Sequence, residues 1–230
     1  MFKRRLFRAY ESSGLARYRA RALGRGRPTA VFIWIPKTAG SSLQKTLGMP
    51  LMASRRAVRH RFPGNGIVTF GHQDYAELVS SAAVDAAFDR VAFKFCFVRN
   101  PYDRAVSLFC YLQRIGLVSP AASFLEVCRR LVRDGVEPIG TFNARGWSQF
   151  NPQQKWMERL SLDFVGRFES LDADLDRLFR ALGLPGRALP KLNQSSRRPY
   201  AHYFCAESKA LIEHFYAEDF QQLEYEHESF

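Results

Sequence analysis

Three apolar runs of strand length alternate with helical segments along this chain. They lie at Val31–Ile35, Ile67–Phe70 and residues 91–98. Each run is followed by turn residues and then by a segment whose apolar residues have helical spacing. One later helical segment carries its apolar side chains on a single face, at Leu171, Leu175, Leu178, Phe179 and Leu182. This order of elements predicts an α/β protein in three layers, with a central parallel sheet flanked by helices.

The first predicted strand ends in a loop of small and polar residues. Pro36 breaks the apolar run. The residues after it that could bind a ligand are Lys37, Thr38, Gly40, Ser41 and Ser42. A helix is predicted next, because Leu43 and Leu47 lie one turn apart. A strand, a small-residue loop and a helix N-terminus together are typical of a phosphate-binding segment, since loop amides and the helix dipole favour an anion.

The position of the lysine narrows the kind of anion. In a triphosphate-binding loop of the Walker type, lysine directly follows the second glycine and a magnesium-binding hydroxyl comes next. Here Ser41 follows Gly40, and Lys37 stands three residues before that glycine. The spacing therefore argues against a magnesium–triphosphate site.

A second segment of the same kind follows the strand predicted at 91–98. Asn100 is a favourable helix N-cap, Pro101 suits the first helical position, and Asp103 suits the first turn. Arg99 is then expected at the carboxyl end of a strand, and Ser107 about two turns into the next helix. A guanidinium offers a planar fork to a phosphate, and a nearby hydroxyl adds one donor.

These two motifs resemble those of sulfotransferases that use 3′-phosphoadenosine 5′-phosphosulfate (PAPS). The segment Ile-Pro-Lys-Thr-Ala-Gly-Ser-Ser at 35–42 is similar to the 5′-phosphosulfate loop of the carbohydrate branch, including its uronyl 2-O members. The resemblance implies that residues 37–42, Ala39 among them, hold the 5′ group, and that Arg99 and Ser107 grip the 3′-phosphate. It also implies a P-loop-like fold and PAPS as the donor, with no metal.

The resemblance covers most of residues 30–220. The segment 162–171 is similar to a late strand that runs into a helix, and residues 151–154 to a Pro-Gln element that precedes it. Residues 192–197 resemble a loop that closes over the nucleotide, which adds Ser195 and Arg197 to the expected donor site. We therefore expect a sulfotransferase domain at 29–230.

Transfer of a sulfuryl group to a hydroxyl needs a cation at the leaving group and a base for the acceptor proton. Lys37 is the candidate for the leaving-group oxygen. His72, directly after the predicted strand at Ile67–Phe70, is the candidate base, and the segment around it resembles the catalytic histidine segment of uronyl 2-O-sulfotransferases. A histidine that only bonds backbone at a helix start is the alternative, and His60, Asp74 and Glu77 are other candidate bases.

The net charge of +12 suits an anionic ligand, but much of it lies near the N-terminus. Residues 1–28 contain nine lysines and arginines and one acidic residue, Glu11. We expect a basic tail here, with contact of residues 1–27 with an anionic membrane surface as the second interpretation and a transit-like segment as a third. No apolar run has the length of a membrane span, and no signal-peptide core follows Met1, which predicts a cytoplasmic protein of bacterial type.

The acceptor is expected to be a carbohydrate or a glycolipid, and the basic loop at 55–61 is compatible with an anionic sugar polymer. Two other functions stay open at this level. A P-loop kinase would share the fold, although the lysine spacing argues against it. A non-catalytic basic module would bind membranes or other anions through the tail; nucleic acid is not an expected partner, because no aromatic pattern for reading bases accompanies the arginines.

Overall fold

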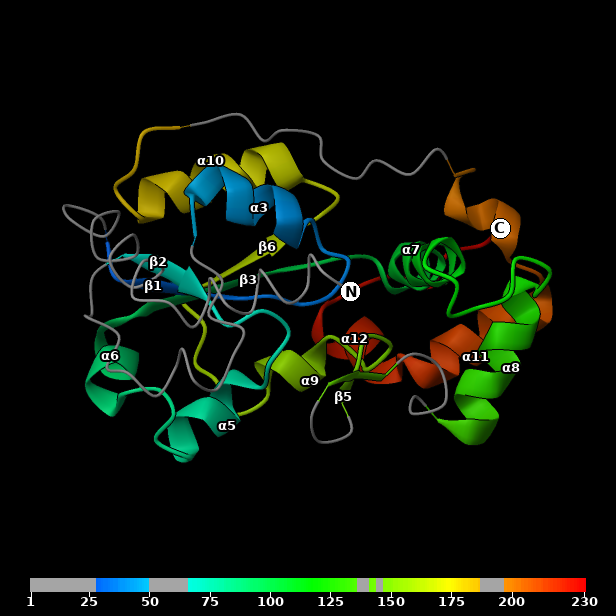
Figure 1. Cartoon of the computed structure of the whole chain (residues 1–230). Coiled ribbons are helices and arrows are strands. Elements are labelled where there is room, and N and C mark those ends of the chain that lie inside the picture. Colours follow the sequence, from blue (N-terminus) through cyan, green and yellow to red (C-terminus); the bar gives the residue numbers. More distant parts are fainter. Residues whose placement is uncertain (1–27, 50–65, 136–140, 144–146, 187–196) are drawn as a thin grey trace. The chain divides into compact units, whose positions relative to one another are not determined.

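The computed structural model describes residues 28–49, 66–135, 141–143, 147–186 and 197–230 (Figure 1). These residues divide into two compact units. Unit 1 contains a sheet and its covering helices. Unit 2 contains the short segment Pro36–Thr38 together with most of the chain that follows the third strand. The predicted tail, the loop at 55–61, His60 and Ser195 lie outside the described residues.

The sheet of unit 1 has four strands in the order β2-β1-β3-β6. They are β1 (Ala30–Ile33), β2 (Ile67–Thr69), β3 (Phe93–Val98) and β6 (Phe164–Arg167). Strand β1 pairs in parallel with β2 on one side and with β3 on the other. Because parallel strands end at the same edge, the residues that follow β1 and β2 in unit 1 leave the sheet in one direction.

Helices cover both faces of this sheet (Figure 1). Helices α3 (Gly40–Leu47) and α10 (Leu171–Ala181) lie on one face, and the short helices α5 (Tyr75–Ser80) and α6 (Ala86–Val91) lie on the other. The first face is closed by one apolar core that includes Phe32, Leu43, Leu47, Phe95, Phe97, Leu175, Leu178 and Phe179. The predicted three-layer α/β arrangement with a central parallel sheet is confirmed.

Two predicted strand boundaries were wrong by two residues, and the start of the first strand and the end of the second differ by one residue. The first strand ends at Ile33 instead of Ile35, because the chain turns there and the Ile35 amide donates to the Ile33 carbonyl at 3.1 Å. The third strand begins at Phe93 instead of residue 91. Asp85 caps a helix by accepting from the Ala87 amide at 2.7 Å, and that helix includes Val91.

Unit 2 is mainly helical. Its elements are α7 (Pro101–Arg114), α8 (Phe124–Asp134), β4 (Thr141–Asn143), β5 (Trp147–Ser148), η1 (Tyr200–Tyr203), α11 (Ala206–Phe215) and α12 (Ala217–Gln222). The short helix α9 (Gln154–Met157) begins in unit 2 and ends in unit 1. An apolar core around Tyr102, Phe109, Phe124 and Ile212 joins α7, α8 and α11. Among the described residues, none of the helices has the length and apolar character needed to cross a bilayer.

Candidate functional site

The backbone of Arg99, the first residue after β3, is held by one buried side chain. The Arg99 amide donates to Gln153 Oε1 at 2.9 Å, and Gln153 Nε2 donates to the Arg99 carbonyl at 2.8 Å. The buried carboxylate of Asp219 in turn accepts from the amides of Gln153 (2.8 Å) and Gln154 (3.0 Å), and burial raises the pKa of Asp219. Gln153 belongs to the Pro-Gln element of the sequence, and its role here is to fix the main chain at Arg99.

The start of α7 directs the side chain of Arg99. Asn100 caps the helix, since its Oδ1 accepts from the Tyr102 amide at 2.9 Å, as the sequence predicted. The Arg99 guanidinium donates to Asp103 Oδ2 from Nε at 2.8 Å and lies 2.6 Å from it through Nη2. Its Nη1 donates to the Lys37 carbonyl at 3.0 Å, and Arg197 Nη2 pairs with the other oxygen of Asp103. Asp103 thus joins two arginines that come from distant parts of the sequence.

One face of α7 carries polar groups over three turns. Asp103, Ser107, Tyr111 and Arg114 follow one another at spacings of four, four and three residues, which places them on one side of a helix. The Lys37 ammonium lies 4.4 Å from the centroid of the Tyr111 ring, and the Arg114 guanidinium lies 5.4 Å from the same centroid. The ring of Tyr111 therefore contacts two cations.

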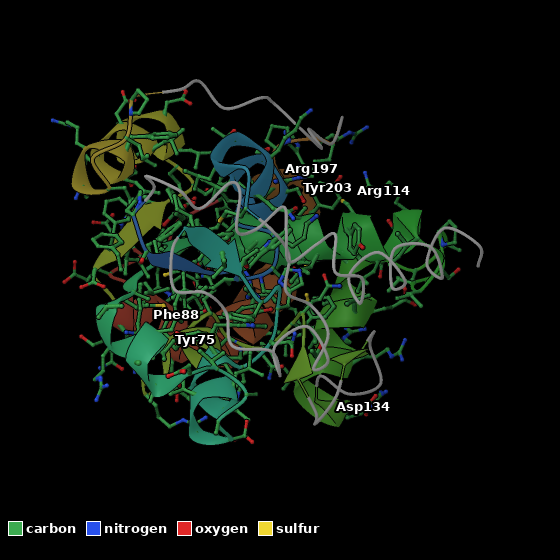
Figure 2. All side chains as sticks on the ribbon, turned by 60° about the vertical axis from the view of Figure 1, so that its left-hand side comes forward. Tyr75, Phe88, Arg114, Asp134, Arg197 and Tyr203 are labelled. Carbon is green, nitrogen blue, oxygen red and sulfur yellow. The ribbon has the colours of Figure 1, made fainter. Side chains whose placement is uncertain are left out.

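Four cations gather beside this helix face, and we call Lys37, Arg99, Arg114 and Arg197 the cation cluster. Burial, and then the positive charges of Arg99, Arg114 and Arg197 in that order of effect, together lower the pKa of Lys37 to about 8. Figure 2 shows Arg114 and Arg197 in one region of the molecule with Tyr203, whose hydroxyl accepts from the Cys110 thiol at 3.7 Å. Mutual repulsion of this kind is relieved by an anion with several charges.

A fully buried arginine holds the residue before Lys37. Arg104 donates from Nε to the Pro36 carbonyl at 3.1 Å, and from Nη2 to the carbonyls of Gln149 (2.7 Å) and Asn151 (3.0 Å). Three carbonyls bound by one guanidinium tie two segments of unit 2, one at Pro36 and one at Gln149 and Asn151, to α7. Arg104 was not among the residues predicted from the sequence, although its position gives a signal: it lies three residues after Pro101 and four before Leu108, within the apolar stripe of the helix.

The loop after β1 contains two residues with left-handed backbone conformation. Lys37 has φ 70° and Ala39 has φ 66°, which side chains other than glycine adopt at a cost. Ala39 is the N-cap residue of α3, and within the described residues no side chain caps that helix. Left-handed residues in a loop turn backbone amides toward one side, which is the way anion-binding loops present them.

Gly40, the glycine of the first motif, packs against an aromatic ring. A Cβ atom on Gly40 would lie 1.8 Å from Nε1 of Trp34, so this position accepts only hydrogen beside the indole. Of the two serines that follow, Ser41 is exposed and Ser42 is buried. Thr38, in unit 2, is also buried.

His72 lies in unit 1, just beyond the end of β2, with a fixed ring orientation. Its Nδ1 lies 2.7 Å from the carbonyl oxygen of Trp34, and because a carbonyl only accepts, Nδ1 carries the proton. The indole of Trp34 contacts the imidazole edge-on, with 5.1 Å between ring centroids. Trp156 Nε1 donates to the His72 carbonyl at 3.3 Å. In the neutral ring, the lone pair therefore belongs to Nε2, the atom that can take a proton.

The two described alternatives to His72 have structural roles. Asp74 caps α5 by accepting from the Glu77 amide at 3.1 Å, and it also accepts from Arg159 at 3.0 Å. Glu77 lies in the first turn of α5, where a carboxylate complements the helix dipole. Both carboxylates stabilise the helix that begins after His72.

The structure thus brings together three of the predicted donor-site residues, Lys37, Arg99 and Arg197. Ser107 lies on the face of α7 beside which these three residues gather. Ala39, Gly40, Ser41 and Ser42 form the start of α3 in unit 1, and His72 lies in unit 1 with Trp34. Asp103, Tyr111 and Arg114 were not predicted from the sequence as members of the site. Their spacing relative to Ser107 was the signal that could have found them. The described residues contain no group of three or more side chains arranged to hold a metal ion.

Comparisons with known proteins give distant similarities. No protein family model matches the sequence. A protein from Archaeoglobus fulgidus, described as uncharacterized, is 25% identical over 107 residues, which cover 46% of this chain and 80% of that protein. Among solved structures, a sulfotransferase from Alicyclobacillus acidocaldarius is similar with a TM-score of 0.49 and 17% identity, over 86% of this chain and 95% of that one. Similarities at this level do not define an activity.

Proposed function

We propose that this protein is a PAPS-dependent sulfotransferase, which moves a sulfuryl group to a hydroxyl of a carbohydrate or glycolipid acceptor. The observation that carries the proposal is the cation cluster. Lys37 and Arg99, the basic residues of two motifs separated by about sixty positions, are joined in it by a hydrogen bond, and Asp103 adds Arg197. The order of the two motifs along the chain does not by itself bring these side chains together. Their convergence suits a nucleotide that carries phosphate groups at two positions.

The residues present fit such a donor. Arg99, Ser107 and Arg197 would hold the 3′-phosphate, because guanidinium groups and a hydroxyl lie along one face of α7. Lys37, the amides of residues 38–40, Ser41 and Ser42 would hold the 5′-phosphosulfate. PAPS supplies the activated sulfuryl group. The protein supplies positive charge at the oxygen that keeps the electron pair when the sulfur–oxygen bond breaks, and Lys37 is proposed for this role.

His72 is proposed as the base. In an in-line displacement the acceptor oxygen forms the new bond to sulfur and loses its proton, which passes to Nε2 of His72. The bond from Nδ1 to the Trp34 carbonyl supports this role, because it fixes the tautomer in which Nε2 accepts. The imidazolium formed after proton uptake keeps the same hydrogen bond.

Binding of 3′-phosphoadenosine 5′-phosphate, the product nucleotide, tests the donor site directly by calorimetry with a chelator present. We expect binding without metal, and a loss of about 1.5–3 kcal/mol for Arg99→Ala, since a charge-assisted contact is removed. Adenosine 5′-phosphate lacks the 3′-phosphate, and its weaker binding should change little. Equal losses for both nucleotides would rule out the role of Arg99, and tighter binding of ATP with magnesium would favour a kinase.

Turnover tests the base. With labelled PAPS and a panel of oligosaccharide and glycolipid acceptors, His72→Ala should lower kcat by about 10²-fold or more while nucleotide affinity stays close to that of the unchanged protein. His202→Ala, which changes an exposed histidine of η1, is the matched control. Normal turnover of the His72 variant would move the role to His60, Asp74 or Glu77, and transfer to none of the acceptors would contradict a carbohydrate substrate.

We further propose that residues 1–27 act as a basic tail, which in the cytoplasm can contact an anionic membrane surface. Its support is the density of arginine in the sequence. Deletion of these residues should leave the melting temperature and nucleotide affinity nearly unchanged and reduce retention on phosphatidylserine vesicles in a salt-sensitive way. A shortened protein that does not fold would show that the tail belongs to the folded domain.

A further inference from the structure

Arg114 lies at the last turn of α7, beyond both sequence motifs, and its surroundings distinguish it from an ordinary surface arginine. It is exposed, so the fold does not depend on its burial. Its guanidinium nevertheless lies over the ring of Tyr111, at 5.4 Å from the centroid. The ring of Tyr111 also contacts the Lys37 ammonium at 4.4 Å, so Arg114 shares its aromatic contact with a second cation.

The direction of Arg114 follows from the helix. Asp103, Ser107 and Tyr111 precede it on the same face, so Arg114 extends by one turn the row that begins at the Arg99–Asp103 ion pair. In Figure 2, Arg114 lies in the same region of the molecule as Arg197 and Tyr203. Among the described residues, the titratable groups near this row are Lys37, Arg99, Arg197, Tyr203 and, on α7 itself, Cys110. Within the described part of the chain, Asp103 is the carboxylate that forms ion pairs with the cation cluster, one with Arg99 and one with Arg197.

We infer that Arg114 is a ligand-binding residue, which contacts an anionic group of the nucleotide or of the acceptor that the cation cluster takes up. The inference rests on the proposed function, and it adds a residue that neither motif contains. Among the described residues, Asp103 is the carboxylate that forms ion pairs with this cluster of four cations, so the cluster keeps an excess of positive charge. A phosphate or carboxylate of the ligand is the partner that balances them. The stacking on Tyr111 holds the guanidinium in place before the ligand arrives, which reduces the entropy lost on binding.

The test replaces Arg114 by Gln and compares it with a matched arginine elsewhere. Arg180 is the control, because it is also exposed and also lies in the last turn of a helix, α10 of unit 1. For 3′-phosphoadenosine 5′-phosphate we expect affinity to fall roughly tenfold in Arg114→Gln and to stay within about twofold in Arg180→Gln. Arg114→Lys should recover part of the loss, since it restores the charge without the planar contact to Tyr111.

A second arm separates the two sources of the anion. A uronate-containing oligosaccharide and its carboxyl-reduced form are titrated into the protein saturated with the nucleotide. If Arg114→Gln leaves nucleotide affinity unchanged and weakens only the uronate form, Arg114 serves the acceptor, and the inference stands. If neither the nucleotide nor the uronate form responds more than in Arg180→Gln, the inference is wrong.

The failure of the proposed function gives a different result. In that case the unchanged protein does not bind 3′-phosphoadenosine 5′-phosphate, and Arg99→Ala has nothing to weaken; the inference then falls with the function on which it rests. Loss of nucleotide affinity in Arg99→Ala but not in Arg114→Gln, with no change in the oligosaccharide arm, contradicts the inference alone. Circular dichroism of each variant confirms that the fold is retained, as expected for an exposed position.

Discussion

The chain leaves β1 and β3 in two different ways. After β3, side chains hold the main chain: Gln153 pairs with both backbone groups of Arg99, and Asn100 caps the helix that follows. After β1, Arg104 and Arg99 bind the carbonyls of Pro36 and Lys37, but backbone conformation directs the amides, since Lys37 and Ala39 are left-handed and, among the described residues, no side chain caps α3. The first arrangement orients a side chain, and the second orients amide groups.

The difference suits the two parts of a nucleotide donor. A terminal phosphate monoester is recognised well by guanidinium groups whose position is fixed, and the segment after β3 provides them. A group that reacts needs donors arranged closely around it, and small residues in a loop let amides approach. The following predictions test whether side-chain bonds and backbone conformation contribute separately, as this comparison requires.

The largest effect is expected where one side chain supports both arrangements. Arg104→Met removes the donor of the Pro36, Gln149 and Asn151 carbonyls, together with a positive charge that stabilises the carboxylate of the buried Asp219. We expect the free energy of unfolding to fall by about 3–5 kcal/mol in urea titrations. As the control, Arg177→Met removes a 2.8 Å ion pair from a side chain that is 62% exposed and should cost less than about 1 kcal/mol.

In Arg104→Lys the charge is kept but the fork is lost, so that at most some of the three carbonyls stay bound. We expect intermediate stability and weaker nucleotide binding than in the unchanged protein, with the Lys37 loop less well held. An Arg104→Met protein as stable as the unchanged one would show that the buried guanidinium does not hold the segment before Lys37.

The next effect concerns the close approach of Trp34 to Gly40. In Gly40→Ala the new methyl group meets the indole, so the ring must shift, and we expect a loss of about 1–3 kcal/mol. Trp34→Ala removes the obstacle. The double variant should therefore be more stable than the sum of the two single losses predicts, by about 0.5–3 kcal/mol in a thermodynamic cycle. Strict additivity would mean that the glycine is required by something other than the ring.

Protonation of Lys37 provides a third test, measured as the affinity for 3′-phosphoadenosine 5′-phosphate between pH 7 and 10. Burial and the neighbouring arginines lower the pKa of Lys37 to about 8, so the ammonium is lost as the pH rises through that value. Affinity should then fall by up to about tenfold per pH unit above pH 8. A Lys37→Arg protein, whose guanidinium stays charged, should show a flat profile over this range.

The sign of the stability effect separates this loss from unfolding. The unfolded chain holds the Lys37 proton up to its ordinary pKa of 10.5, whereas the folded chain releases it near 8. Between these values the unfolded state binds more protons, so the contribution of this group to stability increases with pH. A parallel fall of affinity and melting temperature would therefore contradict the assignment to Lys37.

These cases show why the sequence predicted one arrangement better than the other. The segment after β3 depends on residue types with local preferences, and the cap at Asn100 and the position of Arg99 at the strand end were both predicted. The contacts of Arg104 were not, because they join α7 to Pro36, Gln149 and Asn151, which are distant in the sequence. The place of Arg114 in the site was missed because Lys37, which shares the ring of Tyr111 with it, is also distant in the sequence. The apolar face of α10 was predicted in full, since one helical period determines it.

The loop after β1 was predicted only as a loop. Nothing in the residue types at positions 37 and 39 indicates left-handed backbone, since Lys and Ala avoid it and the surrounding structure must impose it. The contact between Trp34 and Gly40 was missed for a similar reason: a glycine in a phosphate-loop motif already has an explanation, and the packing of the ring appears only in three dimensions.

The smallest expected effects come from the two N-cap residues, and they have opposite signs. Asn100→Ala removes the cap of α7 and should lower the free energy of unfolding by about 1 kcal/mol. Ala39→Gly relieves a left-handed residue and should raise it by about 0.5–1 kcal/mol, the gain being limited by the greater freedom of glycine in the unfolded chain. Both changes are measured by urea unfolding on otherwise identical proteins. Destabilisation by Ala39→Gly would mean that the alanine methyl group contributes packing that outweighs the backbone cost, and the start of α3 would then depend on side-chain packing as well as on backbone conformation.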